Sequence, residues 1–142
     1  MDKYKIVLAV LATSRGKVYT PVQIQKSLFL IDKNIPEMVQ GPHFDFQPYA
    51  YGPFDKNIYN ILDELAQKDL VEIIESGRNW KKYRLTQNGQ ELGQKALESI
   101  DKKSREYIHN ISNFVLSLSF AQLVSAIYKA YPEMKKNSVF RD

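Results

Sequence analysis

The sequence has no cysteine among its 142 residues. Disulfide bridges and thiolate metal sites are therefore excluded, and the composition is compatible with a reducing cytoplasm, where we place the protein. Histidine is nearly absent as well, because His43 and His109 lie far apart and lack the spacing of a metal site. The six glycines are scattered at turns and form no phosphate-binding loop. We therefore expect no metal, no cofactor and no catalytic site, and we predict that the protein is not an enzyme.

Long apolar runs are also missing. The N-terminal run Ile6–Ala12 is too short to span a membrane, and it lacks the cleavage site of a signal peptide. No internal repeat or low-complexity linker divides the chain. We therefore expect a soluble protein without membrane contact, folded as a single domain over residues 1–142. Within it we expect a core over about residues 2–103, C-terminal helices over about 104–132, and a loose tail over 133–142.

Helical periodicity is clear in several segments. The spacing of Tyr4, Val7, Leu8 and Leu11 predicts an amphipathic helix over residues 2–14. The next predicted helix runs to about residue 33. It begins with Pro21 at its first position and a capping box formed by Thr20 and Gln23.

Four further helices are predicted along the chain. One covers residues 55–69, is capped by Asp55 and has a regular apolar stripe. Another begins after Thr86. A third begins at Tyr107, with residues 101–106 as either a break or a continuation of the preceding helix. The last opens with a capping box formed by Ser119 and Gln122 and ends before Pro132.

Two runs, Leu70–Glu75 and Lys81–Thr86, flank a short turn-rich tip and predict a β-hairpin. A register centred on the tip places Ile73 opposite Tyr83 and Val71 opposite Leu85, on the core side. It places Glu72 opposite Arg84 and Glu75 opposite Lys81. A helix followed by such a hairpin is typical of a winged helix. The predicted fold class is therefore α+β, a winged helix-turn-helix core with an aromatic-rich insertion over residues 34–54 and a C-terminal helical pair.

The net charge of +4 is unevenly distributed. Residues 34–75 carry eight acidic and two basic side chains, whereas the segments on either side are basic. This pattern predicts one acidic and one basic surface, if the segments separate in space. Nucleic acid, an acidic protein or a second copy of the chain would each suit the basic surface.

A winged helix makes double-stranded DNA the leading candidate partner, and basic residues near the wing would bind phosphates. The opposing observations are that Glu72 and Glu75 pair with cations of the same hairpin, and that the helix over 55–69 is acidic where DNA phosphates would approach. The candidate contacts to nucleic acid are Arg15, Lys17, Lys26, Arg78, Trp80 and Lys82.

The insertion supplies a second candidate surface. About twenty residues separate the two helices that a helix-turn-helix joins by three or four, and long loops in compact domains are usually functional. Its aromatic residues either bind a protein partner or fill the gap between the insertion and the helices. The candidate partner contacts are Phe44, Phe46, Tyr49 and Tyr51.

Several motifs resemble known families. The segment from Gln23 to Leu30 is similar to the "LQK-L" helix of the Panacea domain of SocA-type antitoxins, and Tyr51–Phe54 is similar to its "YGP" turn. The end of the hairpin, Tyr83–Gly89, resembles a signature of many winged-helix proteins. The chain's last helix resembles that of the YwgA-like proteins, which we take as the nearer group. The Panacea likeness implies a co-encoded protein partner, and the winged-helix likeness implies DNA.

The sequence thus leads to two functional hypotheses. The first is a small non-enzymatic regulator of transcription that binds DNA. The alternative is an antitoxin-like protein-interaction module. The apolar C-terminal pair over residues 107–131 either braces the core or forms a homodimer contact.

Overall fold

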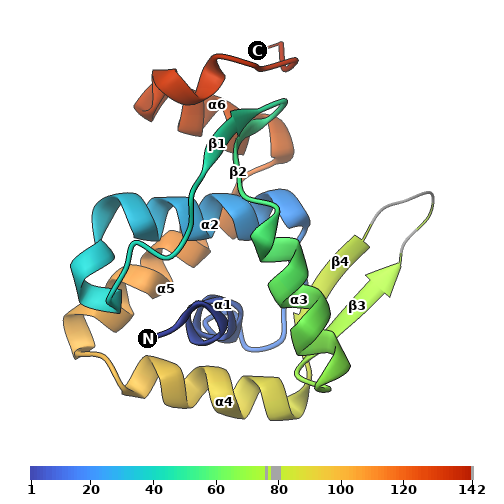
Figure 1. Ribbon diagram of the computed structural model, residues 1–142, viewed down its shortest axis with the longest axis vertical. Helices are drawn as coiled ribbons and strands as arrows, with labels where there is room; N and C mark the ends of the chain where they lie inside the picture. The colour runs from blue at the N-terminus through green and yellow to red at the C-terminus, as the bar shows by residue number, and fades with distance from the viewer. Residues whose placement is uncertain (76, 78–80, 142) are drawn as a thin grey trace.

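The computed structural model describes residues 1–75, 77 and 81–141. It has mixed helix and sheet, with two antiparallel hairpins, and confirms the predicted α+β class. Figure 1 shows the arrangement. The elements are, in order, α1 (Lys3–Ala12), α2 (Pro21–Asn34), β1 (Gln47–Tyr49), β2 (Gly52–Phe54), α3 (Asn57–Gln67), β3 (Val71–Glu75), β4 (Lys81–Leu85), α4 (Gln87–Glu98), α5 (Lys102–Ser117) and α6 (Phe120–Ala130).

Helix α1 lies at the centre of the molecule, seen end-on in Figure 1, with α2, α3, α4 and α5 arranged around it. Every residue from Ile6 to Ala12 is buried. The prediction of an amphipathic helix was therefore wrong for this element. A helix that is apolar on all sides must be enclosed on all sides, and Tyr4, which the predicted apolar face included, lies at the surface.

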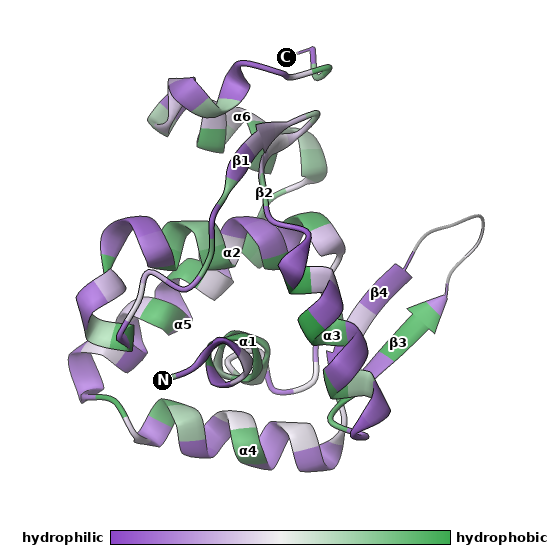
Figure 2. Ribbon diagram, in the orientation of Figure 1, coloured by the Kyte–Doolittle hydropathy of each residue, from purple (hydrophilic) through white to green (hydrophobic). Residues whose placement is uncertain are grey.

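The winged-helix hairpin has the predicted register. Val71 pairs with Leu85, Ile73 with Tyr83, and Glu75 with Lys81. Tyr19 forms an isolated antiparallel bridge with Tyr83, so the segment before α2 adds a short third strand position beside β4. Figure 2 shows β4 as mainly hydrophilic beside the more hydrophobic β3. The tip residues Arg78 and Trp80 lie outside the described part of the chain.

Two features attach the helices that follow the wing to α1. Helix α4 packs closely on α1 at Gly93, where a Cβ atom would come within 2.5 Å of the Leu8 carbonyl oxygen. Helix α5 is joined through Tyr19, whose buried hydroxyl lies 2.6 Å from Ser112 Oγ and also donates to the Val10 carbonyl. Asp101 separates α4 from α5 and caps α5, which begins at Lys102 and not at the predicted Tyr107. The C-terminal helix α5 therefore braces the core.

The insertion between α2 and α3 forms the small β1–β2 hairpin above α2 (Figure 1). Asp55 was expected to cap α3, but the helix begins two residues later, with Lys56 at the cap position. The Asp55 carboxylate instead accepts hydrogen bonds from the backbone N–H groups of Asn57 and Asp45. It closes the turn that joins β2 to α3 and ties the two ends of the hairpin together.

The C-terminal residues were expected to be a loose tail, and the structure corrects this. After α6 a 3₁₀ turn buries Met134. The segment then follows the tip of the β1–β2 hairpin, where the Val139 N–H donates to the Ala50 carbonyl at 3.0 Å and Asn137 donates to Pro48. The tail is thus part of the fold, because the Val139 backbone N–H and the Asn137 side chain both donate to carbonyl groups of the hairpin.

In the part of the chain that the structure describes, no helix is both long and apolar enough to cross a bilayer.

We predict that Gly93→Ala lowers the free energy of unfolding by about 1 to 3 kcal/mol, because the added methyl group forces α4 away from α1. Helix propensity alone would favour alanine over glycine by about 1 kcal/mol. A loss of stability would therefore be caused by the packing of α4 on α1. Urea denaturation measures it. The matched control Gln94→Ala, at an exposed neighbouring position, should stay within about 0.5 kcal/mol of wild type. Equal stability of both variants would contradict the close contact.

A candidate docking groove beside the inserted hairpin

A groove lies where the first half of α2 meets the β1–β2 hairpin, α3 and the start of α6. It consists of two adjoining hollows of about 310 and 560 Å³, which share Pro21, Val22, Tyr51 and Tyr59. We name it the docking groove. The smaller hollow is further lined by Gln25, Lys26, Tyr49, Ala50, Gly52 and Phe54, and the larger by Thr20, Gln23, Lys81, Lys82, Leu118, Phe120 and Leu123.

The wall of the groove is fixed to α2 by one side chain. Gln25 is 2% exposed, and its amide nitrogen donates to the Asp55 carbonyl while its amide oxygen accepts from the Asp55 N–H, both at 3.0 Å. This two-way pairing gives both the amide nitrogen and the amide oxygen of the buried Gln25 a hydrogen-bond partner. It also fixes the end of the β1–β2 hairpin at one position along α2.

Five aromatic residues line the groove. Tyr51 packs edge-on against Phe120 with ring centroids 5.1 Å apart, and Tyr49 packs on Phe54 at 5.0 Å. Edge-to-face packing is the favoured geometry for such rings. Even so, Tyr49, Tyr51 and Phe120 remain about half exposed, at 52, 44 and 47%. The rings are held in position yet still open to solvent.

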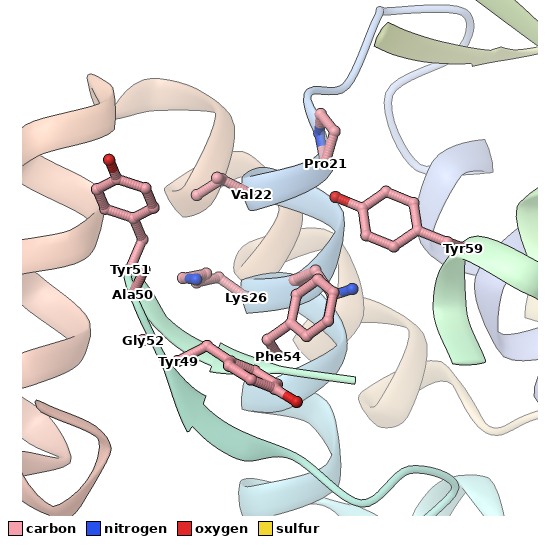
Figure 3. A pocket seen from close by; sticks show the side chains of 10 residues that line it. Pro21, Val22, Lys26, Tyr49, Ala50, Tyr51, Gly52, Phe54 and Tyr59 are labelled. Atoms are coloured by element: carbon pink, nitrogen blue, oxygen red, sulfur yellow. The ribbon is translucent and has the colours of Figure 1, made fainter. Parts of the chain in front are cut away.

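Lys26 lies at the floor of the smaller hollow, between α2 and the hairpin (Figure 3). It is only 3% exposed, and its ammonium donates one long hydrogen bond, 3.4 Å, to the Pro53 carbonyl. No carboxylate of the described residues lies within 4.0 Å of it. Desolvation lowers the pKa of Lys26 from 10.5 to about 8, so the group still carries its charge at neutral pH. A buried cation without a counter-ion is costly.

The four aromatic residues predicted as partner contacts divide into two pairs. Phe46 packs edge-on against the buried Phe29, with ring centroids 5.4 Å apart, and Phe44 lies against Phe46. These two rings fill the gap between the insertion and α2. Tyr49 and Tyr51 line the docking groove instead. Phe44 and Phe46 therefore fill the gap, whereas the role of Tyr49 and Tyr51 as partner contacts stays a prediction.

The residues predicted to contact nucleic acid differ in their surroundings within the described part of the chain. Arg15 and Lys17 are exposed in the loop after α1, and Arg15 lines a separate hollow with Thr86 and Gln90. Lys82 is exposed on the wing and lines the docking groove. Lys26 is buried, at 3% exposure, and lines the smaller hollow of the docking groove. Arg78 and Trp80 lie outside the described residues.

The charges around α3 are predominantly acidic. The helix contains Asp63 and Glu64 and no basic residue. The Tyr4 hydroxyl donates to the Glu64 carboxylate, and this hydrogen bond raises the pKa of Tyr4. On the wing, Arg84 forms an ion pair with Glu72 at 2.8 Å. Much of the surface where a winged helix would meet DNA is therefore negative or neutralised.

The sequence did not single out Tyr59, Phe120 or the buried state of Lys26. Tyr59 and Phe120 lie at the starts of α3 and α6, and nothing local indicates that these helix ends meet at the hairpin. One signal was available. The two segments that carried the Panacea likeness, around Lys26 and over Tyr51–Phe54, converge on the smaller hollow.

No protein-family model matches the chain, and no curated protein matches it. Within residues 1–75, 77 and 81–141, no cluster of three histidine or acidic side chains could hold a metal ion. The function has to be inferred from the groove itself.

We predict that Lys26→Met raises the free energy of unfolding at pH 7 by about 1 to 3 kcal/mol. Methionine has a side chain of similar length, and the substitution removes the buried charge. The advantage should depend on pH. The folded state lowers the pKa of Lys26 to about 8, so the wild type gains stability as the pH rises from about 8 towards the unfolded value of 10.5.

The difference between the two proteins should therefore shrink between pH 8 and pH 10. Urea denaturation at a series of pH values measures it, with Lys33→Met, an exposed position on the same helix, as the control. A constant difference across this range would show that the ammonium is not desolvated.

Proposed function

We propose that this protein is a protein-interaction module that binds an extended, largely apolar segment of a partner protein in the docking groove. The observation that carries the proposal is the groove's set of half-exposed aromatic rings, Tyr49, Tyr51 and Phe120, on a wall fixed by Gln25. Aromatic side chains held in place beside a hollow are the residues that most often dominate the energy of protein interfaces. An exposed apolar surface of this kind usually marks a site of interaction.

The charges favour a protein partner over nucleic acid for this face. Affinity for DNA comes mainly from basic residues that neutralise phosphates. Here the cations are few, since Lys26 is buried and Arg84 is paired with Glu72. Lys81 and Lys82 at the wing end of the groove would instead suit acidic residues at one end of an apolar peptide.

The likeness to the Panacea domain supports the same proposal. It suggests a partner encoded beside this chain, as for an antitoxin and its toxin. Several of the residues that carry this likeness line the groove, among them Gln25, Lys26 and Tyr51. The product of the neighbouring gene is therefore the first partner to test.

Site-specific photocrosslinking tests the proposal. A photoreactive phenylalanine in place of Tyr51 should form a covalent adduct with the co-expressed partner, whereas the same residue in place of Leu92, exposed on α4, should not. With the purified partner, Tyr51→Ala and Phe120→Ala should each weaken binding about 10- to 100-fold, as for interface hot spots. Leu92→Ala should not change the affinity. Binding that is insensitive to both groove variants would contradict the proposal.

Duplex DNA remains a second candidate because the winged-helix order is present and exposed Lys17 and Lys82 flank the wing. If DNA binds there, Lys82→Ala should weaken binding on every sequence and reduce the salt slope by about 1. Tyr51→Ala should leave it unchanged. Fluorescence anisotropy with labelled duplexes measures both. Absence of duplex binding at low salt would exclude this candidate.

A further inference from the structure

The buried ammonium of Lys26 is not explained by the fold alone. It makes one long hydrogen bond, to Pro53, so two of its three N–H groups have no partner among the described residues. A second buried polar group without a hydrogen-bond partner among the described residues lies close to Lys26. The Tyr128 hydroxyl is buried without a hydrogen-bond partner in the described part of the chain. A Cβ atom on Gly52 would touch both side chains, at 3.5 Å from Lys26 Nζ and 3.4 Å from Tyr128 Cε1.

The surroundings of this ammonium define what could pair with it. The hollow of about 310 Å³ is lined mainly by apolar and aromatic side chains. Gln25, the polar neighbour, is bonded to Asp55 through one N–H and through its amide oxygen, and it carries no charge. The hollow thus presents a single positive charge in an apolar setting. A group with one negative charge and an apolar body matches it, whereas a doubly charged phosphate would lack partners.

We propose that this hollow binds the C-terminal carboxylate of the partner segment, with the carboxylate on Lys26 and the last side chain against Tyr49 and Phe54. The inference rests on the proposed function, since it assigns one end of the segment that the docking groove holds. The preceding residues run past Tyr51 and Tyr59, which the two hollows share, to Phe120 and the exposed Lys81 and Lys82. The recognised sequence is an extended one with acidic residues upstream and an apolar last residue.

A chain terminus fits the hollow better than an internal acidic side chain. The last residue of a chain brings its carboxylate and its own side chain together, so one residue supplies the anion and the apolar body. An aspartate or glutamate within a chain supplies the anion on only one or two methylene groups and leaves the aromatic wall of Tyr49 and Phe54 uncovered. Capture of a terminal carboxylate is an established mode of peptide recognition.

Four small probes test the site on the full chain by ¹⁵N NMR titration. N-acetylphenylalanine carries the proposed terminal carboxylate, and N-acetylphenylalanine amide is its neutral control. 3-Phenylpropionate represents a free small acid, and N-acetylaspartate N-methylamide represents an internal acidic side chain. The expected result is binding of N-acetylphenylalanine at about millimolar affinity, with shifts at Tyr51 and Gly52, and at least tenfold weaker binding of its amide.

Two lysine variants test whether Lys26 causes the preference for the acid over the amide. Lys26→Met should abolish the difference between acid and amide, and Lys33→Met on the same helix should retain it. Equal binding of acid and amide to the wild type, or a preference that survives Lys26→Met, would overturn the proposal. So would absence of acid binding at the limit of its solubility. Tighter binding of 3-phenylpropionate or of the aspartate probe would assign the site to another carboxylate and would also overturn it.

The two proposals fail separately. Partner binding could depend on Tyr51 and Phe120 while the wild type shows no preference for the acid. In that case the docking groove binds the partner, and the proposed site for the terminal carboxylate is wrong. If the acid binds through Lys26 but the partner is insensitive to the groove variants, the pocket recognises a carboxylate and the protein-interaction function is wrong.

Discussion

The enclosure of α1 is the constraint on which the rest of this fold depends. A helix that is apolar around its whole circumference has no side to present to water, so neighbours must cover each of its faces. Helices α2 and α3 and strand β4 cover part of it, and α4 and α5 cover the remainder. The tight approach at Gly93 and the bond from Tyr19 to Ser112 follow from this need. The helices beyond the wing therefore belong to the same core as the winged helix.

Much of the architecture could be predicted from local signals. The capping boxes at Thr20 and Ser119 begin α2 and α6 as the sequence indicated, because each cap depends only on residues three apart. The register of β3 and β4 followed from side-chain alternation around a short tip. These features are encoded within a few residues. Interactions between distant segments do not influence them.

What could not be predicted depends on contacts between distant segments. Lys26 lies away from the apolar stripe of Ile24, Leu28 and Ile31, so periodicity places it on the solvent side of α2. The inserted hairpin then covers that side, and the lysine becomes buried. Asp55 has the side chain of a good helix cap, yet its carboxylate and backbone are held by Asp45 and Gln25 two residues before the helix begins. The tail lacked any local signal, because its partners are carbonyl groups of the hairpin.

The docking of the tail has a consequence for synthesis of the protein. The hairpin is held at its base by Gln25, which precedes it, but its tip is held by residues such as Asn137, which comes 89 positions after its partner Pro48. On the ribosome the wall of the groove therefore emerges long before the segment that fixes it. During that interval Tyr49 and Tyr51 are attached to a hairpin supported at one end only. The nascent chain therefore acquires a complete groove only after the segment around Asn137 and Val139 has also been synthesised.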